Sequence, residues 1–169
     1  MSNVRKFIED LKRVEKELQY LPTDVAVMAA DLFDLNFKNE SFFGKKWTPS
    51  KYVQQENLRA EQSRHLLHKS GNLRRSIRYN VHGNIIEFYS NMPYAGIHNE
   101  GGVINHPGGT AFFKKKGETI WVSKRKAAGK NYPKTKPHKI SIPQRQFVGE
   151  HPQLDREVET LIDDIFKGI

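Results

Sequence analysis

The chain has 169 residues and no cysteine, is 37% hydrophobic and 28% charged, and carries a formal net charge of +9 at pH 7. Without cysteine there is no disulfide framework, thiolate metal site or cysteine nucleophile. No apolar run approaches the roughly 18 residues of a membrane-spanning helix, and the N-terminal segment lacks the apolar stretch of a signal peptide. We therefore expect one soluble domain over residues 1–169, made in the cytoplasm.

The excess positive charge is concentrated in one segment. Residues 113–139 contain ten lysine or arginine residues and one acidic residue, Glu118, whereas the rest of the chain has 18 basic and 18 acidic residues. This pattern predicts a neutral body with a basic, flexible hairpin or loop at about 113–139.

Two helices are predicted at the N-terminus. Apolar residues at helical spacing, from Val4 to Leu21, predict an amphipathic helix over about residues 3–20. Pro22 is expected to interrupt this helix. A second helix, capped by Thr23 or Asp24, is predicted over about residues 24–38 and should be the more buried of the two.

The middle of the chain predicts strands after a short helix at 59–67 and a break at Gly71. Alternating apolar residues in "SIRYNV" predict a strand with one buried face, and a turn at residues 82–84 joins it to a second strand, "IIEFYS". The segments "TIWVS" (119–123) and "KISIP" (139–143) predict further strands.

A last helix is predicted to begin at Pro152, with one apolar stripe. Helices at both ends and strands between them predict an α+β fold. We expect an antiparallel sheet of about four strands, with the N-terminal and C-terminal helices packed on it.

Histidines and acids in "NMPYAGIHNEGGVINH" (91–106) are the first candidates for chemistry. His98 and Glu100 would share a face on a strand and diverge on a helix. His65 and His68 have a spacing that can hold a metal, but no third ligand stands at a typical distance. The chain lacks a nucleophile elbow, a P-loop and a dinucleotide-binding fingerprint. These features favour a non-enzymatic protein without metal or cofactor.

The basic segment leaves three interpretations open. Its charges flank Trp121, which is typical of surfaces that bind nucleic acid through phosphate neutralisation and base stacking. Lysines of an exposed hairpin also protect edge strands from aggregation, and a basic arm can contact an acidic protein. The basic residues at the tip are Lys114, Lys115, Lys116, Lys124, Arg125 and Lys126.

Three ordered segments carry a resemblance to a known family. They are "LLHKSGNLRRSI" (66–77), "NMPYAGIHNEGG" (91–102) and "IPQRQFVGE" (142–150). Together with the aromatic loop "FFGKKWTP" (42–49), they resemble the signature of the bacteriophage virion morphogenesis, or tail completion, family, which includes the G protein of Mu-like phages. A serine stands before Gly71 where the family more often has threonine, and the length of the basic segment varies within the family.

The resemblance implies a structural assembly protein of the virion that completes the tail or forms the neck at the head–tail junction, beside the tail tube, tail terminator or connector. The alternative is a DNA-binding accessory protein of a phage or prophage that uses the basic segment. Because a tail has a rotational axis, we expect a homo-oligomeric ring with head-to-tail contacts on it, and the resemblance implies sixfold symmetry. We expect a monomer or weak oligomer in isolation, because each subunit contact should be small until the tail end templates the ring.

Five residues are candidates for the subunit or partner interface: Tyr94, His98, Glu100, Arg145 and Phe147. The segment from Tyr94 to His98 predicts a strand or short helix, with His98 making a fixed hydrogen bond. Arg145 can make a bidentate contact and Phe147 can anchor in a pocket. An extended segment with these side chains suits either the domain's own core or a neighbouring subunit. The flanks of the basic tip are the second candidate patch, because a strand edge can add to a neighbour's sheet.

Overall fold

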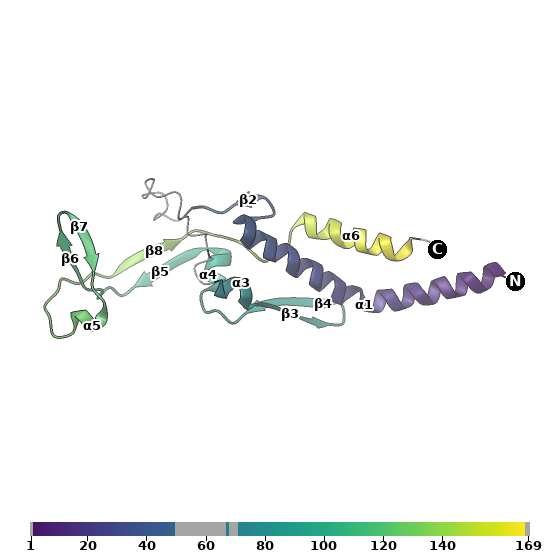
Figure 1. The fold of residues 1–169 in the computed structure, drawn as a ribbon, viewed down its shortest axis with the longest axis horizontal. Helices are drawn as coiled ribbons and strands as arrows, with labels where there is room; N and C mark the ends of the chain where they lie inside the picture. The colour runs from purple at the N-terminus through teal and green to yellow at the C-terminus, as the bar shows by residue number, and fades with distance from the viewer. Residues whose placement is uncertain (1, 50–66, 68–70, 168–169) are drawn as a thin grey trace. The chain divides into compact units, whose positions relative to one another are not determined.

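A computed structural model describes residues 2–49, 67 and 71–167 of the chain (Figure 1). The chain divides into two compact units. Unit 1 comprises residues 1–100 and 144–169, and unit 2 comprises residues 101–143. The helix predicted at 59–67 lies almost wholly outside the described residues.

The N-terminal region of unit 1 is a single helix, α1 (Ser2–Asn39), which continues through Pro22. The prediction of two helices is therefore wrong. Proline removes one intrahelical hydrogen bond and its ring crowds the preceding turn, which costs about 3 kcal/mol and kinks a helix without always ending it. Figure 1 shows α1 changing direction between its purple N-terminal half and its blue C-terminal half. The second half continues because its inner face is buried, through Ala26, Ala29, Phe33 and Phe37.

The hairpin predicted in the middle of the chain is confirmed. Strand β3 (Ile77–His82) pairs antiparallel with β4 (Ile85–Ser90) around a two-residue turn. Alternate residues of β3 are half-buried, as the sequence pattern predicts. The hairpin packs against α1, where the Phe88 ring meets the edge of the Phe33 ring at a centroid distance of 4.9 Å.

The short helix α3 (Asn72–Ser76) precedes this hairpin and is tied to α1 by an ion pair. Arg74 Nη2 donates to Asp34 Oδ2 at 2.7 Å, and Arg74 Nε donates to Asp34 Oδ1. The hydrogen bonds from Arg74 hold the pKa of the Asp34 carboxyl below its ordinary value. Gly71 begins α3 with φ of 65°, a left-handed conformation that favours glycine.

The core of unit 1 gathers residues from five distant parts of the chain. Its buried members are Phe37, Trp47, Leu73, Ala95 and Phe147. The small hairpin of β1 (Ser41–Phe42) and β2 (Lys45–Lys46) leads into Trp47, and Ala95 begins the short helix α4 (Ala95–Glu100).

The predicted C-terminal helix is confirmed as α6 (Pro152–Phe166), which packs along α1. His151 Nδ1 accepts a hydrogen bond from the Gln153 N–H (3.1 Å), and Pro152 occupies the first turn, where its missing N–H costs nothing.

Unit 2 contains two strand pairs and one turn of helix. Strand β5 (Gly102–His106) pairs with β8 (His138–Ile142), and β6 (Phe112–Lys115) pairs with β7 (Glu118–Trp121). Helix α5 (Lys124–Ala127) follows β7. The strands predicted at 119–123 and 139–143 therefore exist as β7 and β8, although they do not pair with each other.

The α+β class is confirmed, with helices at both ends and antiparallel strands between them. In the described residues the strands form four separate two-stranded sheets instead of one sheet of about four strands. In β1–β2, β3–β4 and β6–β7, the paired strands are neighbours in the chain and are joined by a tight turn. Strands β5 and β8 pair with each other although residues 107–137, which contain most of the basic segment, lie between them in the chain.

The continuous helix gives the first prediction. Replacing Pro22 with Ala should raise the free energy of unfolding by about 1–3 kcal/mol, because alanine restores the hydrogen bond and removes the crowding. Urea denaturation measures the change, with Thr23→Ala on the adjacent exposed position as the control. A fall in stability in Pro22→Ala would show that the bend itself is needed for packing.

Candidate interaction surfaces

Residues 145–148 form a segment, the strap, that passes through the core of unit 1 and pairs with no strand among the described residues. The Arg145 N–H donates to the His98 carbonyl oxygen at 2.8 Å. The N–H groups of Phe147 and Val148 both donate to Asn99 Oδ1, at 3.0 and 3.1 Å. Helix α4 therefore provides the acceptors that a neighbouring strand would otherwise supply.

Two carbonyl oxygens of the strap accept hydrogen bonds from side chains of α1 and the aromatic loop. Asn36 Nδ2 donates to the Phe147 carbonyl oxygen at 3.2 Å, and Trp47 Nε1 donates to that of Gln146 at 2.7 Å. The other end of the Asn36 amide, Oδ1, accepts the Phe43 N–H at 2.9 Å. One buried amide thus joins the strap, α1 and the aromatic loop.

Two of the interface candidates lie in the strap and are buried. Phe147 is 3% exposed, and its ring centroid lies 4.9 Å from that of Phe37. Arg145 is 7% exposed, and its Nε donates to the Thr48 carbonyl oxygen at 3.0 Å. No carboxylate of the described residues pairs with Arg145. The structure places both side chains in the protein's own core, the first of the two alternatives that the sequence leaves open.

The other three candidates lie at α4. Tyr94 and Glu100 are exposed, and Tyr94 packs edge-on against the His98 ring at a centroid distance of 6.0 Å. Because α4 is helical, the side chains of His98 and Glu100 diverge and do not form an acid–base pair. His98 Nδ1 is buried without a hydrogen-bond partner among the described residues, so the predicted fixed hydrogen bond is not found at this atom.

Burial lowers the pKa of the His98 imidazole, and the positive charge of Arg145 lowers it further. Folding therefore favours the neutral ring. In the unfolded chain the imidazole has its ordinary pKa of about 6.5, so the unfolded state binds the proton first as the pH falls.

Unit 2 presents the basic residues that the sequence singles out. Lys114 and Lys115 lie on β6, Lys116 lies in the β6–β7 turn, and α5 carries the other three. All six side chains are exposed.

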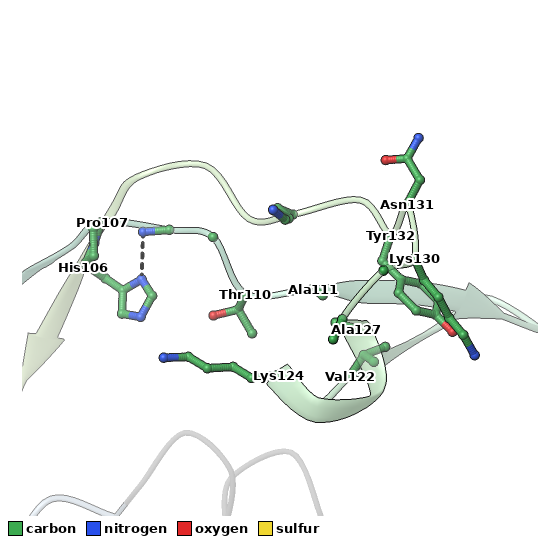
Figure 2. A pocket seen from close by; sticks show the side chains of 15 residues that line it. His106, Pro107, Thr110, Ala111, Val122, Lys124, Ala127, Lys130, Asn131 and Tyr132 are labelled. Carbon is green, nitrogen blue, oxygen red and sulfur yellow. Dashed lines mark hydrogen bonds between the residues drawn. The ribbon is translucent and has the colours of Figure 1, made fainter.

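A cavity of about 850 Å³ lies wholly within unit 2, between the loop 106–111, α5 and the loop 129–134 (Figure 2). Gly108 has φ of 79°, and a Cβ atom there would lie 2.5 Å from the Thr135 carbonyl oxygen. Glycine is therefore required at position 108, where the loop passes close to the backbone of residues 135–137. His106 Nδ1 accepts the Gly108 N–H at 3.0 Å, and this bond fixes the ring at the edge of the cavity.

Among the described residues, no group of three histidine, aspartate or glutamate side chains is placed to hold a metal ion. His65 and His68 lie outside the described residues. Within the same described part of the chain, no helix has the length and apolar character needed to span a membrane.

The chain matches the profile of the phage virion morphogenesis family over residues 2–167. It belongs to this family. Neither a curated protein nor a solved structure matches the chain.

The structure explains why the segments that resemble this family occur together. The first contributes Leu73 to the core, and the second contributes Ala95 to the core and Asn99 to the strap. The third segment is the strap itself. The aromatic loop adds Trp47, whose indole donates to the strap.

Sequence reasoning did not single out Asn36 and Asn99, which hold the strap. Asn36 carried a signal: it is a polar residue between Phe33 and Phe37, on the apolar face of its helix. Asn99 carried none, because a single asparagine near a glycine pair is typical of a turn.

Removing the Asn99 amide tests the strap. Asn99→Ala should lower the free energy of unfolding by about 2–4 kcal/mol, because it leaves two N–H groups without an acceptor, at about 1–3 kcal/mol each. Chemical denaturation measures the loss, and Asn91→Ala, on a nearby exposed position, is the control. Equal stability of the two variants would contradict the role assigned to Asn99.

The lowered pKa of His98 predicts how stability depends on pH. The contribution of His98 to the free energy of unfolding is constant above the ordinary histidine pKa, about 6.5. It is lost as the pH falls below that value, because protonation then favours the unfolded state. The melting temperature should therefore drop less between neutral and mildly acidic pH in His98→Gln than in the wild type. His82→Gln, which removes an exposed histidine, is the control. Identical pH profiles for His98→Gln and the wild type would refute this expectation.

Proposed function

We propose that this protein is a non-enzymatic assembly protein that completes the phage tail or forms the neck at the head–tail junction. Membership of the phage virion morphogenesis family supports this proposal more than any other observation. The placement of the candidate chemical groups agrees with it, because His98 and Glu100 diverge and Arg145 is engaged with the Thr48 backbone.

An apolar stripe on the first half of α1, which is exposed at five positions and buried at Val14, supports a role in assembly. The spacing of three and four residues that buries Ala26 and Phe33 continues toward the N-terminus through large apolar side chains. These side chains are 40–67% exposed, and they are Val4, Phe7, Ile8, Leu11 and Leu18. Contiguous apolar surface of this kind is typical of a subunit whose burial is completed by a neighbour.

We propose that the neighbour is a second copy of the chain in a ring around the tail axis. A ring requires heterologous contacts, in which two different patches of each subunit meet. The stripe of α1 supplies one patch, and the exposed surface at Tyr94 and Glu100 is a candidate for the other. The near-zero net charge of the chain outside residues 113–139 permits close approach of neighbouring subunits.

We also propose that the isolated protein is a monomer or weak oligomer and that the tail end templates the ring. Each contact made by a helix stripe is small, and several such contacts become strong together once subunits are held at neighbouring positions.

The double substitution Phe7→Ser and Leu11→Ser tests the proposal. It should leave the free energy of unfolding within about 0.5 kcal/mol of the wild type, because both side chains are exposed. The variant should nevertheless fail to join purified tails, as measured by co-sedimentation and by electron microscopy of the tail end.

The matched control is Lys12→Ser with Lys16→Ser, which changes two exposed polar residues of the same helix half. This variant should join tails normally. Normal assembly by the Phe7/Leu11 variant would show that the stripe is not part of the interface. Tails of normal length and head attachment in phage lacking the protein would overturn the proposed function as a whole.

A further inference from the structure

Unit 2 carries positive charge that its own residues do not neutralise. Residues 101–143 are all described, and they contain ten lysine or arginine residues but a single carboxylate, Glu118. Within the described part of the chain, no ion pair involves any of these ten cations. The unit is therefore a compact body with a strong positive potential, which attracts polyanions.

Lys124 and Lys130 lie where protection of strand edges does not require them, whereas Lys134 forms an isolated antiparallel β-bridge with Ala111. Lys124 is in α5, whereas Lys130 and Lys134 are in the loop that follows, outside strands β5–β8. Lys124 also opens α5, where a positive charge opposes the helix dipole. Strand protection therefore does not account for the charges of Lys124 and Lys130, and a bound polyanion would account for them.

The same three lysines line the cavity of unit 2. Its lining contains no carboxylate, and it combines small apolar side chains with polar backbone from the glycine-rich loop. Figure 2 shows the Lys124 side chain running below Thr110 toward His106. Its volume of about 850 Å³ lies within the range of sites for small organic ligands, so a nucleotide unit can enter.

The β6–β7 hairpin adds an exposed aromatic surface to this charge. Its inner face carries Phe113, whose ring centroid lies 6.1 Å from that of Tyr132, a residue of the cavity wall. Strand alternation places Trp121 and Lys114 on the outer face, and Trp121 is 59% exposed. An exposed indole beside lysines is the combination with which proteins stack unpaired bases.

We propose that unit 2 binds single-stranded nucleic acid, with backbone phosphates held at the cavity by Lys124, Lys130 and Lys134 and a base stacked on Trp121. An acidic protein would be attracted by the same lysines but would gain no base stacking on the indole. Loss of Trp121 should therefore lower the affinity for a single strand but not the affinity for an acidic protein. This inference does not depend on the proposed ring, whose subunits would meet through the apolar stripe of α1.

Fluorescence anisotropy with a labelled oligothymidine of roughly 20 nucleotides, a length that spans the sites of single-strand-binding domains, tests the lysines in the full-length protein. In Lys124→Gln/Lys130→Gln/Lys134→Gln, the slope of log affinity against log salt should fall by about 2, since each phosphate contact to a single strand contributes about 0.7. The control Lys6→Gln/Lys12→Gln/Lys16→Gln makes the same charge change on α1 of unit 1 and should leave the slope unchanged. An equal fall of the slope in the two triple variants would show that the cavity lysines are not the binding site.

Trp121→Ala tests the stacking and the class of ligand. It should weaken binding of the single strand by about 5- to 150-fold and leave binding of a duplex of the same length nearly unchanged. Thermal unfolding should show that this variant keeps its fold, since the replaced side chain is exposed. Wild-type affinity in Trp121→Ala, or displacement of the labelled oligonucleotide by polyglutamate as effectively as by unlabelled oligothymidine of equal charge, would overturn the assignment to nucleic acid and leave an acidic protein as the partner.

Discussion

The structure of unit 1 depends on one requirement: the backbone of the strap must form hydrogen bonds although no strand of the described residues pairs with it. A buried N–H or carbonyl group without a partner costs about as much as a lost hydrogen bond, and often more. Asn99 satisfies two of the N–H groups, while Asn36 and Trp47 satisfy two of the carbonyl oxygens. These contacts fix the end of α1, the aromatic loop and α4 around the strap, so the core can assemble only when all four segments are in place.

The distribution of charge is the second organising feature. Residues outside 113–139 are balanced, and the whole excess of +9 lies in unit 2. In a ring, copies of unit 2 would repel one another, although salt screens this repulsion beyond about 8 Å at physiological ionic strength. A polyanion bound to each unit 2 would offset the repulsion. The two proposals are independent in their evidence, but the second would ease the electrostatic cost of the first.

Sequence reasoning succeeded where a pattern is local and failed where a distant contact decides. Alternation in β3 and the proline at the start of α6 predicted those elements, because each pattern reflects burial or capping within a few residues. The greater burial of the second half of α1 was predicted, but the break expected at Pro22 was wrong, because a proline can kink a helix without ending it. The pairing of β5 with β8 could not be predicted, because β5 begins within the glycine pair Gly101–Gly102 and its partner lies beyond the basic segment.

The candidate site was predictable only in part, again because contacts between distant parts of the chain decide where its side chains lie. The resemblance identified the correct segments, but the sequence could not decide whether Arg145 and Phe147 face the core or a neighbour. That distinction depends on which side chains the strap meets across the fold, and Asn36 and Asn99 gave little local sign of this role. The six basic residues were easier to place, because a charged segment with one acid must lie at the surface.

The bend at Pro22 and the apolar stripe of α1 have a common consequence. On the C-terminal side of the proline, the inner face of the helix is buried in unit 1. On the N-terminal side the same spacing continues, but apart from Val14, which is buried, the large apolar side chains at Val4, Phe7, Ile8, Leu11 and Leu18 are exposed. Burial of an apolar side chain contributes about 1.5–3 kcal/mol, so the isolated chain forgoes this stabilisation at each exposed position of the stripe. Charged residues interleaved with the stripe, among them Arg5, Lys6 and Glu9, oppose non-specific association. An uncovered face of this kind contributes little to the fold of one chain, and its stabilisation becomes available only when a neighbouring subunit covers it.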